Sequence, residues 1–169
     1  VKAFTPKTKA VNVTHIINWN GQILPVRKIA DEAHKRNIDV LVDGAHSFAH
    51  FDFKIPDLHG DYFASSLHKW LYAPIGSGML YVKKEKIKNI YPLFATSDDP
   101  LKNDIRKFEN LGTRPFFIEQ AIGKALEFYT KSFGQPAMGK TLNIVQIDDE
   151  SLDYYSANGM LFISSRQFE

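Results

Sequence analysis

Residues 40–82 read VLVDGAHSFAHFDFKIPDLHGDYFASSLHKWLYAPIGSGMLYV, and the interpretation of the whole chain starts from this stretch. An apolar run ends at Asp43, and Lys69 follows inside the sequence Ser-Leu-His-Lys-Trp. A lysine in a partly apolar pocket can lose its proton and form a Schiff base with an aldehyde. A nearby aspartate can keep the ring nitrogen of pyridoxal phosphate protonated. We therefore expect Asp43 and Lys69 to belong to one cofactor site.

The segments around this stretch predict the fold. Residues 10–17 and 38–42 are apolar runs typical of buried strands, and residues 25–36 between them carry apolar side chains at helical spacing. Apolar strands separated by a helix indicate a parallel sheet that is covered on both sides. Further strands are expected at 62–65, 78–82, 142–147 and 160–164, and helices at 85–90 and 118–130. The predicted fold class is α/β, with a mostly parallel sheet flanked by helices.

Polar residues at the strand ends suggest where a ligand would bind. In an open parallel sheet, ligands lie beyond the carboxyl ends of the strands. Asn18 and Asp43 each follow an apolar run, so we expect both at the same edge of the sheet. An isolated Asp-Gly pair would be an ordinary turn. The second polar strand end and the lysine flanked by serine and histidine favour a binding site.

Composition narrows the classes of function. The chain has 169 residues, 44% of them hydrophobic, which is enough for one globular domain with a core. A net charge of +2 without a dense basic stripe argues against nucleic acid as a partner. The absence of cysteine excludes a disulfide framework and a thiolate metal site within these residues. No apolar run could span a bilayer and no signal peptide is visible, so we expect a cytoplasmic protein with no membrane partner.

Several short segments carry a resemblance to a known family. In chain order they are Thr-His-Ile-Ile-Asn (14–18), Pro-Val (25–26), Val-Asp-Gly-Ala-His (42–46), Ser-Leu-His-Lys (66–69) and Pro-Ile-Gly-Ser-Gly (74–78). They resemble the large domain of fold-type I pyridoxal-phosphate enzymes of aminotransferase class V. That group includes cysteine desulfurases, selenocysteine lyases and isopenicillin N epimerase-like proteins. The resemblance extends to residues 109–113 and so covers about three quarters of the chain.

The resemblance implies a role for each matching residue near the cofactor ring. Lys69 would carry pyridoxal 5'-phosphate as a Schiff base and then move protons at the α-carbon of the substrate. Asp43 would pair with the ring nitrogen. His46 stands where many relatives have glutamine, and it would lie near the phenolic oxygen of the ring together with Asn18.

The phosphate group of the cofactor would be bound by Ser66 and His68, whose hydroxyl and ring N–H are suitable donors. Thr113 would reach the phosphate of a neighbouring subunit, which implies a homodimer with a shared site. The resemblance also implies a small-molecule amino-acid substrate that undergoes transamination, racemisation or β-elimination. The Asp-Gly-Ala-His sequence favours the epimerase-like branch, with cysteine desulfurase or selenocysteine lyase as the alternative.

The domain organisation is expected to be incomplete. Residues 1–133 would be part of the large cofactor-binding domain, and residues 134–169 an uncertain segment that could belong to the small C-terminal domain. The chain begins with valine, so we expect it to be a fragment of a longer enzyme and to lack catalytic activity by itself. A further alternative is a protein that keeps this fold as an interaction surface and has no catalytic activity.

Residues 134–141 (GQPAMGKT) match the phosphate-binding loop of nucleotide hydrolases letter for letter. That loop requires a strand before it and a helix after it. Here the preceding residues have a helical pattern and the following residues resemble a strand. A nucleotide-binding module remains an alternative function.

A zinc site is a weaker alternative. His46 and His50 are four residues apart, and Asp52 and His59 lie nearby in the sequence. The phenylalanines and proline among them indicate an extended, irregular segment rather than one helix face. No metal ligands are therefore assigned.

Overall fold

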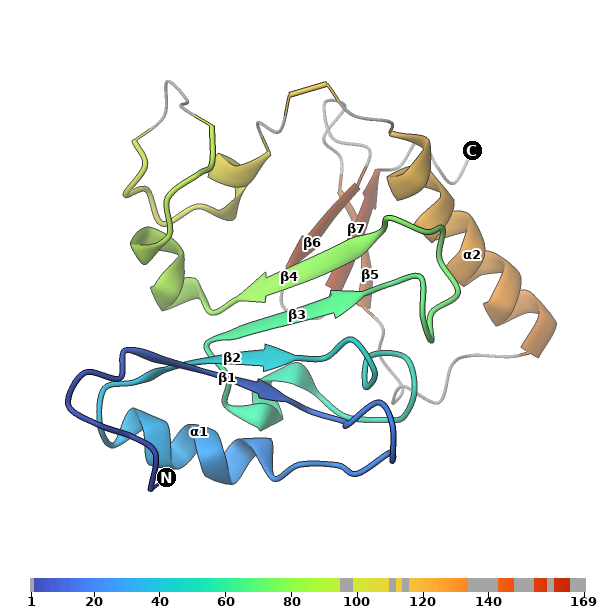
Figure 1. Ribbon diagram of the computed structural model, residues 1–169. Helices are drawn as coiled ribbons and strands as arrows, with labels where there is room; N and C mark the ends of the chain where they lie inside the picture. Colours follow the sequence, from blue (N-terminus) through green and yellow to red (C-terminus); the bar gives the residue numbers. More distant parts are fainter. Residues whose placement is uncertain are drawn as a thin grey trace.

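A four-stranded sheet with the strand order β1-β2-β3-β4 forms the centre of the fold (Figure 1). Strands β1, β2 and β3 are parallel, and β4 is antiparallel to β3. The prediction of a mostly parallel α/β sheet is confirmed. The strands are β1 (Ala10–Thr14), β2 (Asp39–Asp43), β3 (Tyr62–Ser66) and β4 (Gly78–Val82). This computed structural model describes residues 2–94, 99–109, 112–113, 116–133, 143–147, 154–157 and 160–164.

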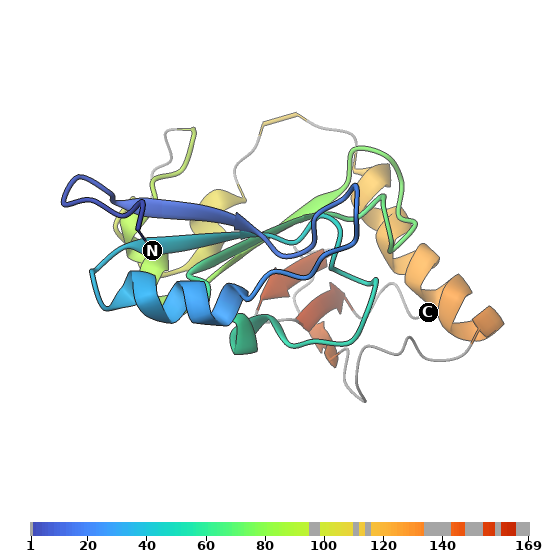
Figure 2. The same ribbon diagram turned by 60° about the horizontal axis from the view of Figure 1, so that its bottom comes forward.

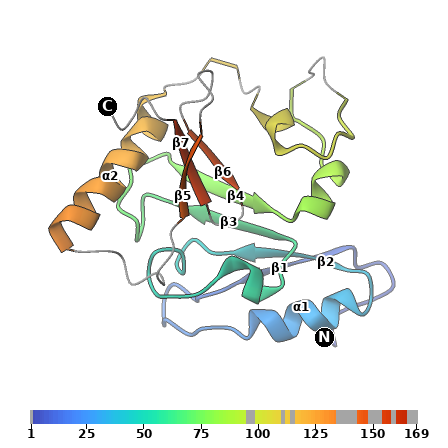
Figure 3. The ribbon, with the colours of Figure 1, turned by 180° about the vertical axis from the view of Figure 1, so that it is seen from behind.

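Two α-helices accompany this sheet. Helix α1 (Val26–His34) connects β1 to β2 and covers one face of the sheet, and α2 (Phe117–Phe133) lies beyond the carboxyl end of β3 (Figures 2 and 3). A second sheet of three strands has the order β5-β7-β6. The remaining elements are the 3-10 helices η1 (Ile55–Leu58), η2 (Lys84–Asn89) and η3 (Ile105–Phe108), and the strands β5 (Asn143–Ile147), β6 (Tyr154–Ala157) and β7 (Met160–Ser164).

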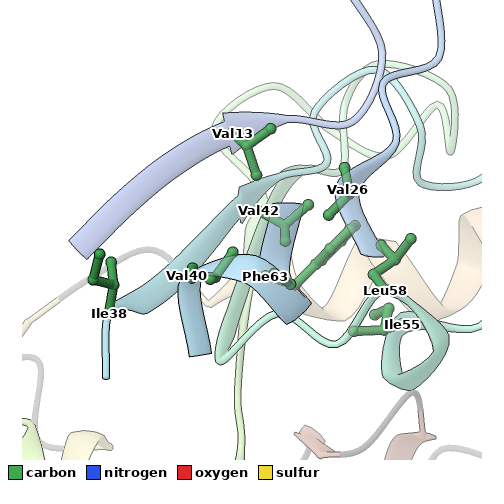
Figure 4. Packing of buried hydrophobic residues seen from close by; sticks show 10 residues of the cluster. Val13, Val26, Ile38, Val40, Val42, Ile55, Leu58 and Phe63 are labelled. Atoms are coloured by element: carbon green, nitrogen blue, oxygen red, sulfur yellow. The ribbon is translucent and has the colours of Figure 1, made fainter. Parts of the chain in front are cut away.

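The core lies between the first sheet and α1. Side chains alternate across a strand, and the register places Val13 beside Val42 and Val42 beside Phe63 on the same face. Burying each such side chain stabilises the fold by about 1.5–3 kcal/mol. The buried cluster consists of Val13, Val26, Ala30, Ala33, Ile38, Val40, Val42, Ile55, Leu58 and Phe63 (Figure 4).

The first strand is shorter than predicted. We expected a strand over residues 10–17, but β1 ends at Thr14. The chain then turns back, with a bridge between Ile16 and Ile23 and a hydrogen bond from the Ile17 N–H to the Gln22 carbonyl (3.0 Å). The turn-forming Asn-Trp-Asn-Gly sequence reverses the chain, so Asn18 lies in this turn rather than directly after the strand.

Two predicted helix boundaries also need correction. Pro25 caps α1 instead of forming its first turn, because its ψ of 62° lies outside the helical region. The short helix expected at 85–90 is the 3-10 helix η2. Helix α2 extends beyond both ends of the predicted range 118–130.

A buried carboxylate joins the opposite, amino ends of β2 and β3. Asp61 is 2% exposed and accepts hydrogen bonds from His34 Nε2 and from the Val40 N–H, both at 2.8 Å. The amines of Lys83 and Lys86 lie 3.6 and 3.7 Å from its other oxygen. Burial disfavours ionisation of Asp61, but these hydrogen bonds and charges outweigh it and hold the pKa of Asp61 below its ordinary value.

Replacing Asp61 by asparagine is expected to destabilise the fold by about 3 kcal/mol, because it leaves the partly buried side chains of His34, Lys83 and Lys86 without their anionic partner. Since the pKa of Asp61 is depressed in the folded state, its contribution is present above about pH 4 and lost as the pH falls through the folded pKa. Denaturant unfolding at pH 7 and pH 3 measures both effects. Asp57→Asn, at an exposed position in η1, is the matched control. An equal loss in both variants, or a loss that is unchanged at pH 3, would contradict this assignment.

We expect that only glycine fits at position 44, because the ring of Phe63 packs directly against its Cα. A Cβ at this position would lie 1.9 Å from Cζ of Phe63, which is 1% exposed and cannot move aside freely. Gly44→Ala should therefore cost about 1–3 kcal/mol in unfolding free energy. A double-mutant cycle with Phe63→Leu tests the cause, because the cost should shrink when the ring is absent. Full additivity of the two substitutions would refute the proposed clash.

Candidate functional site

The parallel pairing of β2 and β3 brings the two predicted anchor residues to one edge of the sheet. Asp43 is the last residue of β2, and Lys69 lies in the loop that follows β3 (residues 67–77, the lysine loop). Two hydrogen bonds join the strand ends at this edge. The Gly44 N–H donates to the Ala64 carbonyl (2.7 Å), and the Ser65 hydroxyl donates to the Gly44 carbonyl (3.2 Å).

Lys69 contacts His46 directly. The distance from Nζ of Lys69 to Nε2 of His46 is 3.0 Å, and both side chains are half-buried. Burial lowers the pKa of His46, the charge of Lys69 lowers it further, and the carboxylate of Asp43 acts in the opposite direction. Because its pKa lies below the ordinary value, His46 is neutral near pH 7 and can accept a hydrogen bond from the lysine.

The lysine loop is held by its own backbone. The Leu67 N–H donates to the Ser77 carbonyl (3.1 Å), and the Ala73 N–H donates back to the Leu67 carbonyl (3.1 Å). The N–H of Tyr72 donates to the carbonyl of Lys69 itself (3.2 Å). Helix α2 supports the loop from outside, with the rings of Tyr72 and Tyr129 5.6 Å apart. These contacts fix the backbone from which the Lys69 side chain extends.

The turn after β2 is similarly organised. The carboxylate of Asp43 accepts a hydrogen bond from the Ala45 N–H (3.0 Å), a pattern in which an aspartate stabilises its own turn. The Ser47 hydroxyl donates to the Gly44 carbonyl (3.3 Å). Asp43 therefore keeps one defined orientation at the strand end.

His68 has a polar atom that lacks a partner. Its Nδ1 is buried and makes no hydrogen bond within the described part of the chain. A buried polar atom without a partner costs about 1–3 kcal/mol, so such atoms are often completed by a ligand. Ser66, the last residue of β3, lies two residues away in sequence. An amine, a carboxylate and an uncommitted imidazole on one edge fit the donor and acceptor requirements of pyridoxal phosphate.

The roles of all the predicted site residues stay predictions. Asn18 is exposed in the turn after β1, and Thr113 is exposed next to Gly112. The structure therefore brings Lys69 and His46 into contact and places Asp43 at the same edge. It does not bring Asn18 or Thr113 to this contact, and it tests the role of none of the predicted residues.

A contact between His50 and Trp70 was not predicted. The two rings stack in parallel, with centroids 3.8 Å apart and planes 5° apart. His50 was considered only as a zinc ligand. The available signal was the four-residue spacing of His50 from His46 and the tryptophan that directly follows Lys69.

The described residues contain no cluster of side chains that would support the zinc alternative. In the part of the chain that the structure describes, no group of three or more histidine, aspartate and glutamate side chains could hold a metal ion. His59 pairs instead with Asp31, at 2.7 Å. The described residues also include no helix that is long and apolar enough to cross a membrane.

The nucleotide-loop match at 134–141 lies outside the described residues. Helix α2 precedes it and strand β5 follows it. This order is the reverse of the strand-loop-helix arrangement that cradles a phosphate at a helix N-terminus.

Known proteins with similar sequences point to one family. The chain is 35% identical over 143 residues to an isopenicillin N epimerase from Streptomyces clavuligerus, and this match covers 76% of the chain and 36% of that protein. A probable cysteine desulfurase from Halalkalibacterium halodurans is 40% identical over 92 residues, or 54% of the chain and 22% of that protein. The chain thus spans about a third or less of these relatives' length.

Two solved structures with a similar fold are also cysteine desulfurases. A cysteine desulfurase from Escherichia coli matches with a TM-score of 0.64 and 26% identity, covering 76% of this chain and 34% of that one. The apo cysteine desulfurase from Thermococcus onnurineus NA1 matches with a TM-score of 0.61 and 29% identity, over 75% and 33% of the two chains. The sequence profile of aminotransferase class V matches residues 1–153. The chain therefore belongs to the aminotransferase class V family, whose members include pyridoxal-phosphate enzymes of the fold observed here.

Proposed function

We propose that the protein is a pyridoxal-phosphate enzyme that acts on an amino acid and carries its cofactor on the amine of Lys69. The observation that carries this proposal is the contact between Lys69 Nζ and His46 Nε2 (3.0 Å) at the carboxyl edge of the sheet, where β2 ends in Asp43. Family membership supports the cofactor class. The family contains several reactions, so the geometry of these residues must guide the choice among them.

Bound pyridoxal phosphate withdraws electrons from the α-carbon of an amino acid and so makes the bonds at that carbon easier to break. The carboxylate of Asp43 would keep the ring nitrogen protonated. His68 and Ser66 would donate hydrogen bonds to the phosphate. The amine of Lys69 would hold the cofactor in place and then accept and return a proton at the α-carbon, with His46 beside it.

Among the possible reactions, we propose epimerisation or racemisation of an amino acid. Two observations support this choice. The Asp-Gly-Ala-His segment places a histidine, His46, against the lysine, and a second titratable group next to Lys69 suits repeated proton exchange at one carbon. The match to an isopenicillin N epimerase also covers more of the chain than the match to the cysteine desulfurase, 76% against 54%.

Cysteine desulfurase activity is the second candidate. It is favoured by the solved structures, in which cysteine desulfurases match the fold. The chain contains no cysteine. This fact does not separate the two candidates, because the matched relatives are about three times longer than the chain.

We also propose that the enzyme is a homodimer in which Thr113 approaches the phosphate of the second subunit. The support is the exposed surface of α2, the helix that follows this residue in the sequence. Thr113 is exposed, and Phe117 and Phe128 of α2 are 68% and 59% exposed. Large aromatic side chains exposed together on one element are typical of an interface between proteins.

The cofactor is tested by absorbance of the full-length protein. With pyridoxal phosphate, the wild type should show a yellow absorbance band that borohydride abolishes, and mass spectrometry should then find the cofactor attached to the peptide that contains Lys69. Lys69→Ala should stay colourless, whereas Lys84→Ala, at an exposed lysine, should behave as wild type. Circular dichroism verifies that both variants are folded. A protein that remains colourless with added cofactor, or a colour that survives Lys69→Ala, would disprove the proposal.

The reaction is tested by incubating the loaded enzyme with a panel of amino acids in D2O. An epimerase should exchange the α-proton of its substrate for deuterium and invert the configuration at that carbon, as followed by NMR and chiral chromatography. Both signals should fall at least about 100-fold in Lys69→Ala, because the positioned acid and base is lost. Sulfide release from cysteine without exchange of the α-proton in any other amino acid would favour the desulfurase instead.

A further inference from the structure

The stacked pair His50 and Trp70 connects the two loops that form the candidate site. His50 belongs to the turn that follows β2, and Trp70 belongs to the lysine loop that follows β3. Each ring is next to a site residue. Trp70 directly follows Lys69, and His50 Nδ1 donates a hydrogen bond to the backbone carbonyl of His46 (3.0 Å). The stack therefore bridges the same two loops as the contact between Lys69 and His46.

The hydrogen bond also fixes how His50 is held. A carbonyl oxygen only accepts, so the proton must be on Nδ1 of His50, and the ring plane is tied to its own turn. A parallel stack at 3.8 Å is close contact between two flat rings. His50 is thus fixed on one side by its own backbone and on the other by Trp70.

Both loops adopt a backbone conformation that L-amino acids avoid. Ala49 has a φ of 61° and Tyr72 has a φ of 56°, and neither is glycine. Ala49 precedes His50, and Tyr72 lies two residues after Trp70. Strained backbone persists only where the surrounding contacts hold it, and such strain gathers at functional sites. Each ring of the stack thus lies within two residues, in sequence, of a strained position.

We propose that His50 and Trp70 are positioning residues that hold Nε2 of His46 against Nζ of Lys69, so that the hydrogen bond between them keeps the amine in the position from which it reacts. Nζ of Lys69 donates a hydrogen bond to Nε2 of His46, which is a suitable acceptor because the imidazole is uncharged. The use of that amine to bind pyridoxal phosphate rests on the proposed function, but the positioning itself does not.

Three charged or titratable groups face His46. Lys69 comes from the lysine loop, Asp43 from the end of β2, and His50 from the same turn as His46. Burial lowers the pKa of His46 most, Lys69 lowers it further, Asp43 raises it and His50 lowers it. If the stack is removed, His46 can move away from Lys69 into solvent. Burial and the charge of Lys69, the two main causes of the lowered pKa, would then weaken. The pKa of His46 should therefore rise toward its ordinary value.

The test is histidine hydrogen–deuterium exchange at ring carbon C2, read by mass spectrometry of peptides as a function of pH. It gives the pKa of each histidine separately in the full-length protein from which cofactor has been removed. Trp70→Leu should raise the pKa of His46, whereas Trp70→Phe keeps a ring that can stack and should preserve the wild-type value. Trp19→Leu is the matched control, because Trp19 is 80% exposed.

His34 and His59 serve as internal references, since they pair with Asp61 and Asp31 away from the stack. Their pKa values should not change in Trp70→Leu. A parallel shift at these histidines would indicate general loss of structure and would overturn the positioning role. An unchanged pKa of His46 in Trp70→Leu would overturn it as well.

A second measurement separates this proposal from the proposed function. Pyridoxal phosphate is added to the stripped protein, borohydride stops the reaction at increasing times, and labelled Lys69 is quantified. Trp70→Leu should slow the labelling by about tenfold or more, because the amine is no longer held in place, and Trp70→Phe should restore it. If His46 responds as expected but Lys69 is never labelled even in the wild type, the positioning role stands and the cofactor assignment fails. Labelling at the wild-type rate in Trp70→Leu would refute the positioning role.

Discussion

The parallel pairing of β2 with β3 is the constraint on which the candidate site depends. Parallel strands end at the same edge of a sheet, so the residues that follow them meet there even when they are far apart in the sequence. The register pairs Asp43 with Ala64, and the Gly44 N–H continues the ladder to the Ala64 carbonyl. Any slip in this register would carry Asp43 away from the lysine loop or turn it toward the hydrophobic core.

Packing of the hydrophobic core maintains this strand register. Val42 and Phe63 are neighbours on the face covered by α1, and both are almost completely buried. A slip by one residue would place apolar side chains in solvent and bring polar ones into the core. The bare Cα of Gly44 lets the Phe63 ring fill the space directly beneath the turn. Packing on one face of the sheet thus determines the geometry of the reactive groups at its edge.

The two ends of the sheet differ in how their polar groups are satisfied. At the amino ends of β2 and β3, the buried Asp61 is surrounded by hydrogen-bond donors and positive charges. At the carboxyl ends, Nδ1 of His68 has no partner in the described structure, and Lys69 has a neutral histidine rather than a carboxylate beside it. The first arrangement stabilises the fold, and the second leaves groups able to bind and react. This contrast supports our proposal that the carboxyl edge is the functional one.

Much of this could be predicted from local patterns in the sequence. The apolar runs that became β2 and β4, and the alternation with a helix, indicated a mostly parallel sheet before any contact was known. The lysine and aspartate were recognisable because their flanking residues resemble a family. The end of β1 was predicted wrongly because the apolar run continues to Ile17 while the turn sequence after it reverses the chain earlier. Hydrophobic periodicity does not report where backbone pairing stops.

By itself, the sequence determined the fold class, the family and the residue types available for chemistry, since these follow from short-range patterns of apolar and polar residues. Only the tertiary structure decided which of them meet. The contact of Lys69 with His46, the stack of His50 on Trp70 and the burial of Asp61 all join residues on different strands or loops. Such contacts depend on strand register and on the path of two loops. The physical reason is that both are set by packing over the whole sheet and leave no periodic signal along the chain.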